Sequence, residues 1–342
     1  MASGDLLKKL FKSYQQRDDE SFRTVAMDIV EGERRKNHHV LARDLQRILE
    51  SRNTHRRNGS AVYQFDKLPK DRERGTILLD IRSPDRYLAD IVLSEELQRQ
   101  VEITLQEFQA SFVLQTYGLQ PRRKLLFCGP PGCGKTVCAE AIAGELGLPL
   151  LYTRFDAVIS SYLGETAANL RQVFDYAARG SWVVFFDEFD AIGKSRDDYG
   201  EHGELKRVVN TFLQLLDGFN SHSLFIAATN HEGLLDQALW RRFDDILYFD
   251  KPTAEQIYKL LELKLRGFRH KKVDLAHFVP QITGWSYADI ERVCMEAIKI
   301  SVLTGKEEID NSIFQRALER QLHRASLVNK SRNSAAIASK NG

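Results

Sequence analysis

A glycine-rich segment in the middle of the chain constrains its fold more than any other stretch of the sequence. It reads GPPGCGKT from Gly129 to Thr136, and it lies between the apolar run LLFC and the helical pattern VCAEAIAGEL. Glycines at this spacing let backbone N–H groups turn inward around phosphate oxygens, and the N-terminus of the following helix adds a favourable dipole. Strand, loop and helix in this order form the Walker A pattern, which predicts a phosphate-binding loop.

This loop predicts the contacts of a bound nucleoside triphosphate. We expect Lys135 to bridge the β- and γ-phosphates and the hydroxyl of Thr136 to bind Mg²⁺. The residues predicted to bind ATP in this segment are Gly129, Pro130, Pro131, Gly132, Cys133, Gly134, Lys135, Thr136 and Val137.

A second segment, WVVFFDEFD, ends an apolar run with acidic residues. A strand of this kind would deliver Asp187 to the carboxyl edge of the sheet, where doubly wound folds bind ligands. We expect Asp187 to hold the Mg²⁺ and Glu188 to polarise the attacking water as a general base. Taken alone, an acidic strand end could equally pair with lysines on the surface. Because it follows a Walker A segment, the catalytic interpretation is favoured.

Hydrophobic periodicity divides the chain into five segments. In the middle, short apolar runs alternate with helical patterns, which is typical of a parallel sheet with helices on both faces. Apolar residues at helical spacing occupy both flanking regions. We therefore predict an N-terminal helical bundle (1–51), a linker (52–86), a large α/β subdomain (87–251), a helical lid subdomain (252–327) and a disordered tail (328–342).

Composition limits the classes of protein that fit. The 342 residues carry a formal charge of +2, which argues against nucleic acid as an obligatory partner of the whole chain. No apolar run approaches the ~18 residues needed to cross a bilayer, and the N-terminus has no cleavable signal pattern. The four cysteines form no CxxC pair, which is typical of reduced thiols. We expect a cytoplasmic protein without a transmembrane segment.

Four motifs, in this order and at this approximate spacing, resemble the AAA family of ATPases over roughly Tyr87 to Leu322. They are GPPGCGKT, FFDEFDAIG, IAATNH followed by LDQALWRRFDD, and GWSYADIERVC. No single motif is specific, but the set is. The resemblance implies a P-loop NTPase fold, which is a doubly wound parallel sheet with a C-terminal helical lid. It also implies ATP and Mg²⁺ as cofactors and a homo-oligomer, typically a hexameric ring.

The resemblance implies further catalytic residues. Asn230 matches the polar sensor that helps to orient the lytic water beside the γ-phosphate. Arg241 and Arg242 match arginine fingers, which would reach into the neighbouring subunit's site and stabilise charge in the transition state. Many members have RPGRFD where this chain has the shorter RRFDD, so the sequence leaves open which arginine is the principal finger. Without the resemblance, the pair would be interpreted as surface salt-bridge donors.

The resemblance also places the adenine base. The segment ADIV, with Asp90, Ile91 and Val92, lies where family members contact adenine, and Ala288 belongs to the matching motif of the lid. That motif is commonly GFSGAD, whereas Tyr287 replaces the second glycine here. The sequence therefore leaves open how closely the backbone of Ala288 approaches the base.

The segment SSYLGE contains an aromatic–aliphatic–glycine triplet, Tyr162, Leu163 and Gly164. By itself, Tyr162 would be expected to fold back onto the core. In AAA remodelling enzymes, a triplet at this place projects into the central channel of the ring. There an aromatic ring and an aliphatic group can grip a polypeptide without demanding a sequence. The stretch RDDYGEHGELKRVV resembles a second loop of the channel, with His202 near its tip.

The leading hypothesis is an ATP-driven unfoldase or disassembly machine that threads polypeptide through a ring pore. Its N-terminal bundle would recruit a protein substrate or an adaptor. HEGLL resembles a zinc-protease HExxH motif, but Leu235 takes the place of the second histidine, so any peptidase would be a separate chain. The alternative is a nucleic-acid-associated AAA ATPase, such as a loader or transposition helper, which local basic residues favour. A scaffold with little turnover is a third hypothesis.

Overall fold

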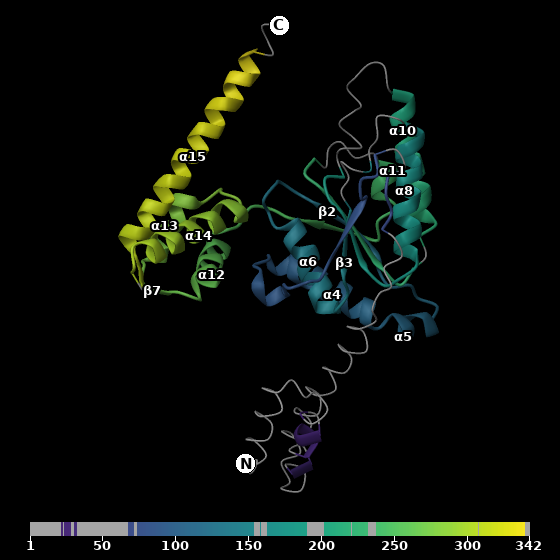
Figure 1. The fold of residues 1–342 in the computed structure, drawn as a ribbon, viewed down its shortest axis with the longest axis horizontal. Coiled ribbons are helices and arrows are strands. Elements are labelled where there is room, and N and C mark those ends of the chain that lie inside the picture. The colour runs from purple at the N-terminus through teal and green to yellow at the C-terminus, as the bar shows by residue number, and fades with distance from the viewer. Residues whose placement is uncertain are drawn as a thin grey trace. The chain divides into compact units, whose positions relative to one another are not determined.

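A computed structural model describes residues 22, 24–28, 31–32, 68–71, 74–153, 158, 163–189, 202–219, 221–231, 237–306 and 308–338. The chain divides into two units, Met1–Lys67 and Leu68–Gly342. Most of the predicted N-terminal bundle, 1–51, lies outside the described residues, and so it stays a prediction. The second unit contains every strand that the structure describes (Figure 1).

A six-stranded sheet with the order β1-β3-β4-β5-β2-β6 forms the centre of this unit. Strands β2 to β6 are parallel, and β1 pairs antiparallel with β3 at one edge. The first parallel strand, β2, lies between β5 and β6, so the chain winds outward in both directions and the predicted α/β class is confirmed. The strands are β1 (Leu79–Arg82), β2 (Lys124–Cys128), β3 (Leu150–Thr153), β4 (Val183–Phe186), β5 (Leu224–Thr229) and β6 (Asp245–Tyr248).

Helices cover both faces of the sheet, which is why its central strands are apolar throughout. Figure 1 shows α4 and α6 on one side and α8 and α10 on the other. On β4, Phe185 packs in the core that α4 and α6 share, whereas Phe186 contacts Phe174 of α8 and Phe212 of α10. The helices are α4 (Glu95–Gln109), α5 (Ser111–Thr116), α6 (Lys135–Leu146), α8 (Leu163–Ala178), α10 (His202–Asp217) and α11 (Gln237–Trp240).

A helical lid with its own core follows the sheet. Ser286 caps the N-terminus of α14 by accepting a hydrogen bond from the amide of Asp289, and Phe278 packs against Phe314 in the core. Two short parallel strands join the lid at its edge. The lid elements are α12 (Ala254–Leu265), β7 (Arg269–Lys272), α13 (Leu275–Ile282), α14 (Tyr287–Leu303), β8 (Glu308–Asp310) and α15 (Asn311–Ala338).

Two boundaries differ from the prediction. The predicted linker, 52–86, contains β1, whose residue Leu79 is fully buried, so part of this segment belongs to the sheet. The predicted disordered tail, 328–342, is helical as far as Ala338. The segment is polar, but it contains no glycine or proline before Ala338, so nothing in its backbone chemistry ends the helix that α15 begins.

The structure also describes the cysteines and the helices that bear on a membrane crossing. All four cysteines are buried and free of disulfides, and burial raises the pKa of Cys138 and of Cys294 to about 12. None of the helices in the described part of the chain has the length and the apolar character that a membrane crossing requires.

Candidate functional site

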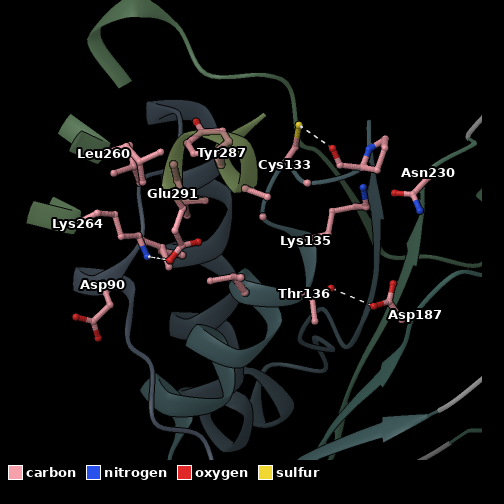
Figure 2. A pocket seen from close by; sticks show the side chains of 18 of the residues that line it. Asp90, Cys133, Lys135, Thr136, Asp187, Asn230, Leu260, Lys264, Tyr287 and Glu291 are labelled. Carbon is pink, nitrogen blue, oxygen red and sulfur yellow. Dashed lines mark hydrogen bonds and ion pairs between the residues drawn. The ribbon is translucent and has the colours of Figure 1, made fainter. Parts of the chain in front are cut away.

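One pocket of about 280 Å³ gathers most of the predicted site residues. It opens at the carboxyl edge of the sheet, beyond the ends of β2, β4 and β5, and the lid closes its other side. Figure 2 shows Lys135, Thr136, Asp187 and Asn230 toward one end and Asp90, Leu260, Lys264 and Glu291 toward the other. The predicted residues that line it are Asp90, Ile91, Val92, Pro131, Gly132, Cys133, Gly134, Lys135, Thr136, Val137, Asp187, Glu188, Asn230 and Ala288.

The glycine-rich loop has a backbone that only glycine adopts without strain. Gly129, Gly132 and Gly134 have φ values of 132°, 75° and 97°. A side chain at Gly129 would also collide with the carbonyl oxygen of Phe249. The glycines therefore allow a turned loop that leads directly into the N-terminus of α6, the kind of loop whose N–H groups bind phosphate in P-loop proteins.

Lys135 is buried beneath this loop, with 6% of its surface exposed. Its Nζ donates to the carbonyl oxygens of Gly129 at 2.6 Å and of Pro130 at 3.0 Å. These two residues do not line the pocket, although the sequence predicts them as nucleotide contacts. They instead hold the ammonium group at the floor of the loop, where an anion can approach it.

Asp187 lies beside this loop and accepts three hydrogen bonds. Its Oδ2 accepts from Thr136 Oγ1 and from the hydroxyl of Tyr152, both at 3.1 Å, and its Oδ1 accepts from the amide of Glu188 at 2.9 Å. Burial, with Asp187 nearby, raises the pKa of Tyr152 to about 12, so the phenol stays protonated and remains a donor. A hydroxyl and a carboxylate this close are hard oxygen ligands, which fit Mg²⁺ held together with substrate phosphates.

Glu188 has a strained backbone. Among the described residues, it is the only non-glycine residue with a positive φ, 53°. This conformation costs of order 1 kcal/mol and persists where the surrounding structure fixes it, often at a functional site. Here the neighbouring Phe189 is fully buried, and its amide donates to the carbonyl oxygen of Ala228 at 2.9 Å. The turn leaves Glu188 on the wall of the pocket.

The lid contacts the glycine-rich loop directly. The amide of Ala288 donates to the carbonyl oxygen of Gly132 at 3.1 Å. Tyr287, which replaces the glycine usual in the motif, packs against the cores of both the lid and the α/β subdomain. Burial raises the pKa of Tyr287 to about 12. The tyrosine therefore fills the junction between the two cores and leaves the Ala288 backbone close to the loop.

Two ion pairs lie at the lid end of the pocket. Lys264 Nζ is 2.7 Å from Glu291 Oε1, and Arg266 Nη2 is 2.7 Å from Asp90 Oδ1. The hydrogen bond from Arg266 holds the pKa of Asp90 below its usual range. The second pair joins the lid to the segment predicted to contact adenine.

Sequence reasoning missed five of the residues that line this pocket. They are Leu93, Leu260, Lys264, Tyr287 and Glu291. Helical spacing could have found Glu291, because it follows the predicted residue Ala288 by three positions. Tyr287 stands out in the sequence only as a departure from the motif.

The remaining predicted residues lie elsewhere. Arg241 and Arg242 follow α11 and do not line the pocket. Arg242 Nε donates to both carboxylate oxygens of Asp217, at 3.1 and 2.9 Å, whereas Arg241 is exposed and forms no ion pair with any described residue. Leu163 and Gly164 begin α8, and Tyr162 lies outside the described residues.

Comparison with known proteins identifies the family. The model of the ATPase family associated with various cellular activities (AAA) matches residues 125–251. A protein of Sinorhizobium fredii, described as "Uncharacterized AAA family ATPase y4kL", is 44% identical over 95% of this chain and 97% of its own length. The chain belongs to the AAA family of ATPases. The protein is accordingly an ATP-hydrolysing enzyme.

This AAA ATPase also resembles two proteins described as "ATP-dependent zinc metalloprotease FtsH". The protein from Aquifex aeolicus is 32% identical over 69% of this chain, and the protein from Methylococcus capsulatus is 33% identical over 68%. The matched region covers 39% and 38% of the lengths of these proteases. The chain thus spans well under half of each.

Proposed function

We propose that this AAA ATPase is an unfoldase or disassembly machine that couples ATP hydrolysis to the threading of polypeptide through a homo-oligomeric ring, typically a hexamer. The nucleotide would lie along the pocket in one orientation. Lys135 and the loop amides would bind the phosphates, while Asp90, Ile91, Val92 and Ala288 would bind the adenine end. The two ends of the pocket are chemically suited to this orientation. Lys135 and the loop amides gather at one end, whereas the lid end offers apolar side chains such as Ile91, Val92 and Leu260 beside the Lys264–Glu291 ion pair.

The catalytic roles follow from the same geometry. Thr136 and Asp187 would hold Mg²⁺, which neutralises phosphate charge when it is bound. Glu188 would accept the proton of the attacking water, and Asn230 would orient that water. All four residues line the pocket. The strained backbone of Glu188 supports its role, because such strain is typical of groups that must point in one direction.

The arginine fingers support the proposed ring. Arg241 and Arg242 do not line their own subunit's pocket, so they can act only on a nucleotide held by another copy. Arg242 is already bound to Asp217, whereas Arg241 is exposed. We therefore assign Arg241 as the principal finger and Arg242 as the residue that holds the turn in place.

The strand order supports a connection between the predicted polypeptide grip and the nucleotide site. β3 and β4 are parallel neighbours, so the chain leaves β3 at the same sheet edge where Asp187 follows β4. That segment leads to Leu163 and Gly164, which begin α8, and Tyr162 directly precedes them in the sequence. A change at the pocket could thus reach the loop over a short path. The relatives described as ATP-dependent proteases support action on polypeptide, and a peptidase would act here as a separate chain.

One observation carries the proposal: Glu188 lies in the same pocket as the Thr136–Asp187 pair. The test is the Glu188→Gln variant, which should bind ATP with wild-type affinity, hydrolyse it at least a hundredfold more slowly and stabilise the oligomer. Glu255→Gln, on the exposed face of α12, is the matched control and should hydrolyse normally. Unchanged hydrolysis in Glu188→Gln would remove Glu188 from its proposed role.

The same variant can identify the substrate. An oligomer arrested in the ATP state should hold its polypeptide, so crosslinking followed by pulldown should recover a protein that the wild type releases. The alternative, a nucleic-acid-associated ATPase, predicts a different result. Stimulation of the wild-type ATPase by DNA, lost at high salt and absent with unfolded protein, would replace the unfoldase proposal with that alternative.

A further inference from the structure

We propose that Tyr152 is a positioning residue for the metal site and that it holds the Asp187 carboxylate in one orientation. The inference rests on the proposed function, because it assigns a supporting residue to the Mg²⁺ site described there. Tyr152 lies in β3, outside the four motifs that identify the family.

A set of three contacts fixes Asp187. Its Oδ2 accepts hydrogen bonds from Thr136 and from Tyr152, each at 3.1 Å, and its Oδ1 accepts one from the amide of Glu188. Thr136 is itself a proposed metal ligand, and the Glu188 amide is the next group along the chain. Tyr152 differs from these two donors. It lies on a neighbouring strand, and it is not a proposed ligand of the metal.

The ring of Tyr152 is in turn held on two sides. The guanidinium carbon of Arg82 lies 3.7 Å from the ring centroid, and the ring of Phe185 lies 5.7 Å away at 40°. Such a cation–π contact contributes roughly 0.5–2 kcal/mol, depending on exposure. The Arg82 side chain also reaches Glu140 of α6, at 3.8 Å. The phenol oxygen is thus fixed by β1, β3 and β4 together.

This support has a consequence for a bound cation. A carboxylate ligand that is already held by a hydrogen bond keeps its orientation before the metal arrives, so metal binding loses less conformational entropy. Removing such an outer partner typically lowers metal affinity or activity by about 10- to 100-fold. We therefore expect the Tyr152 hydroxyl to set the Mg²⁺ concentration at which this site is filled.

The test is Tyr152→Phe, which removes the hydroxyl and keeps the ring under Arg82. The measurement is the binding of a fluorescent ADP analogue, titrated with Mg²⁺ and repeated in EDTA. The variant should need about tenfold more Mg²⁺ for the half-maximal effect, while its affinity in EDTA stays within twofold of the wild type. Tyr258→Phe is the matched control, because the Tyr258 hydroxyl is also bonded to a carboxylate, that of Glu262, away from this site.

An unchanged Mg²⁺ requirement in Tyr152→Phe overturns the inference and leaves the proposed function standing. A wild-type protein whose nucleotide binding ignores Mg²⁺ overturns both. Arg82→Ala gives a second measurement if the first variant folds poorly: with its ring less constrained, Tyr152 should support Asp187 less well, and the Mg²⁺ requirement should rise several-fold. No rise in this folded variant would also count against the inference.

Discussion

The amide of Ala288 lies 3.1 Å from the carbonyl oxygen of Gly132 and donates a hydrogen bond to it. This bond joins the first turn of α14 in the lid to the glycine-rich loop that follows β2. Ser286, the N-cap of the same helix, packs over Gly132 so closely that a Cβ there would lie 2.8 Å from its hydroxyl oxygen. The lid and the glycine-rich loop therefore meet without room for a side chain between them.

A methyl group at Gly132 should disturb this junction. Gly132→Ala places a Cβ against Ser286 and forces alanine to a φ of 75°, which costs about 1–2 kcal/mol in the left-handed region. We expect nucleotide affinity to fall at least tenfold, measured by isothermal titration calorimetry. Gly305→Ala is the matched control, because Gly305 has a φ of 66° and open space around its Cβ. It should lose a similar amount of stability and keep its affinity.

Substitutions of Arg241 and Arg242 should lower the rate of ATP hydrolysis by different amounts. Arg241→Ala should lower the catalytic rate by about a thousandfold or more, the typical value of an arginine finger, with nucleotide binding retained. Arg242→Ala should cost less in rate, because Arg242 is held by Asp217 within its own subunit. Steady-state ATPase assays and nucleotide titrations measure both effects. Equal losses in the two variants would contradict the assignment of Arg241 as the principal finger.

Mixed oligomers test whether the finger acts between subunits. Glu188→Gln subunits keep Arg241, and Arg241→Ala subunits keep Glu188, so each variant should be inactive alone. When they are mixed, an intact pocket can meet an intact arginine from its neighbour, and part of the ATPase activity should return. If activity stays absent in oligomers shown to contain both variants, the two residues do not act across a subunit interface.

A substitution in the predicted channel loop should affect substrate remodelling but not ATP hydrolysis. Tyr162→Ala removes the aromatic group that would grip polypeptide, so remodelling of an unfolded or tagged substrate protein should be lost. Most of the ATP hydrolysis measured without substrate should remain. Tyr117→Phe, on an exposed side chain, controls for a general effect of losing a tyrosine. Remodelling at the wild-type rate in Tyr162→Ala would rule out threading by this loop.

The stability of the lid should depend on pH through Asp310. The hydroxyl of Ser312 and the amide of Ile313, with Lys306, hold the pKa of this N-cap carboxylate well below its usual range. A lowered folded-state pKa stabilises the protein above the unfolded-state value of about 3.9, and this contribution is lost as the pH falls toward the folded-state value. The difference in melting temperature between the wild type and Asp310→Asn should therefore be constant above about pH 5 and shrink below about pH 4.

A second variant of Asp310 distinguishes the effect of the helix-capping hydrogen bond from the effect of the negative charge. Asp310→Ala removes the hydrogen-bond acceptor as well, so it should cost about 1 kcal/mol of unfolding free energy at pH 7. Asp310→Asn keeps an acceptor at the cap and should be less destabilising than Asp310→Ala. Chemical denaturation at neutral and at acidic pH measures the two variants. A melting difference for Asp310→Asn that does not change between pH 7 and pH 3 would contradict the role of the charge.

The sequence was sufficient for the fold class, the family and most of the residues that line the glycine-rich end of the pocket. The reason is that these depend on local chemistry. A glycine-rich turn such as Gly129–Thr136 needs its residues at fixed spacing, and an acidic strand end such as Asp187 needs an apolar strand before it. Because the carboxyl ends of parallel strands share one edge, segments far apart in sequence could be placed together in advance.

Contacts made by unremarkable residues could not be foreseen in this way. In the sequence, Tyr152 is one more residue of an apolar strand. Only the structure shows that its hydroxyl donates a hydrogen bond to Asp187. Strand β1 lies in the segment predicted as a linker, because four residues are too few to show a periodic pattern. The distinction between Arg241 and Arg242 depends on Asp217, which ends an earlier helix and belongs to no motif. Such pairings are set by tertiary packing alone.

The hydrogen bonds between Arg242 and Asp217 connect the end of α10 to the turn that carries the two arginines. Asp217 is the last residue of this 16-residue helix, and His202, in the predicted second channel loop, is the first. At 1.5 Å per residue the helix is about 24 Å long, and its backbone hydrogen bonds make it stiff along its axis. If the segment before His202 contacts polypeptide as predicted, a load at that end of α10 would reach Asp217 and the turn that carries Arg241. The force on a substrate and the chemistry in an adjacent subunit would then share one rigid element.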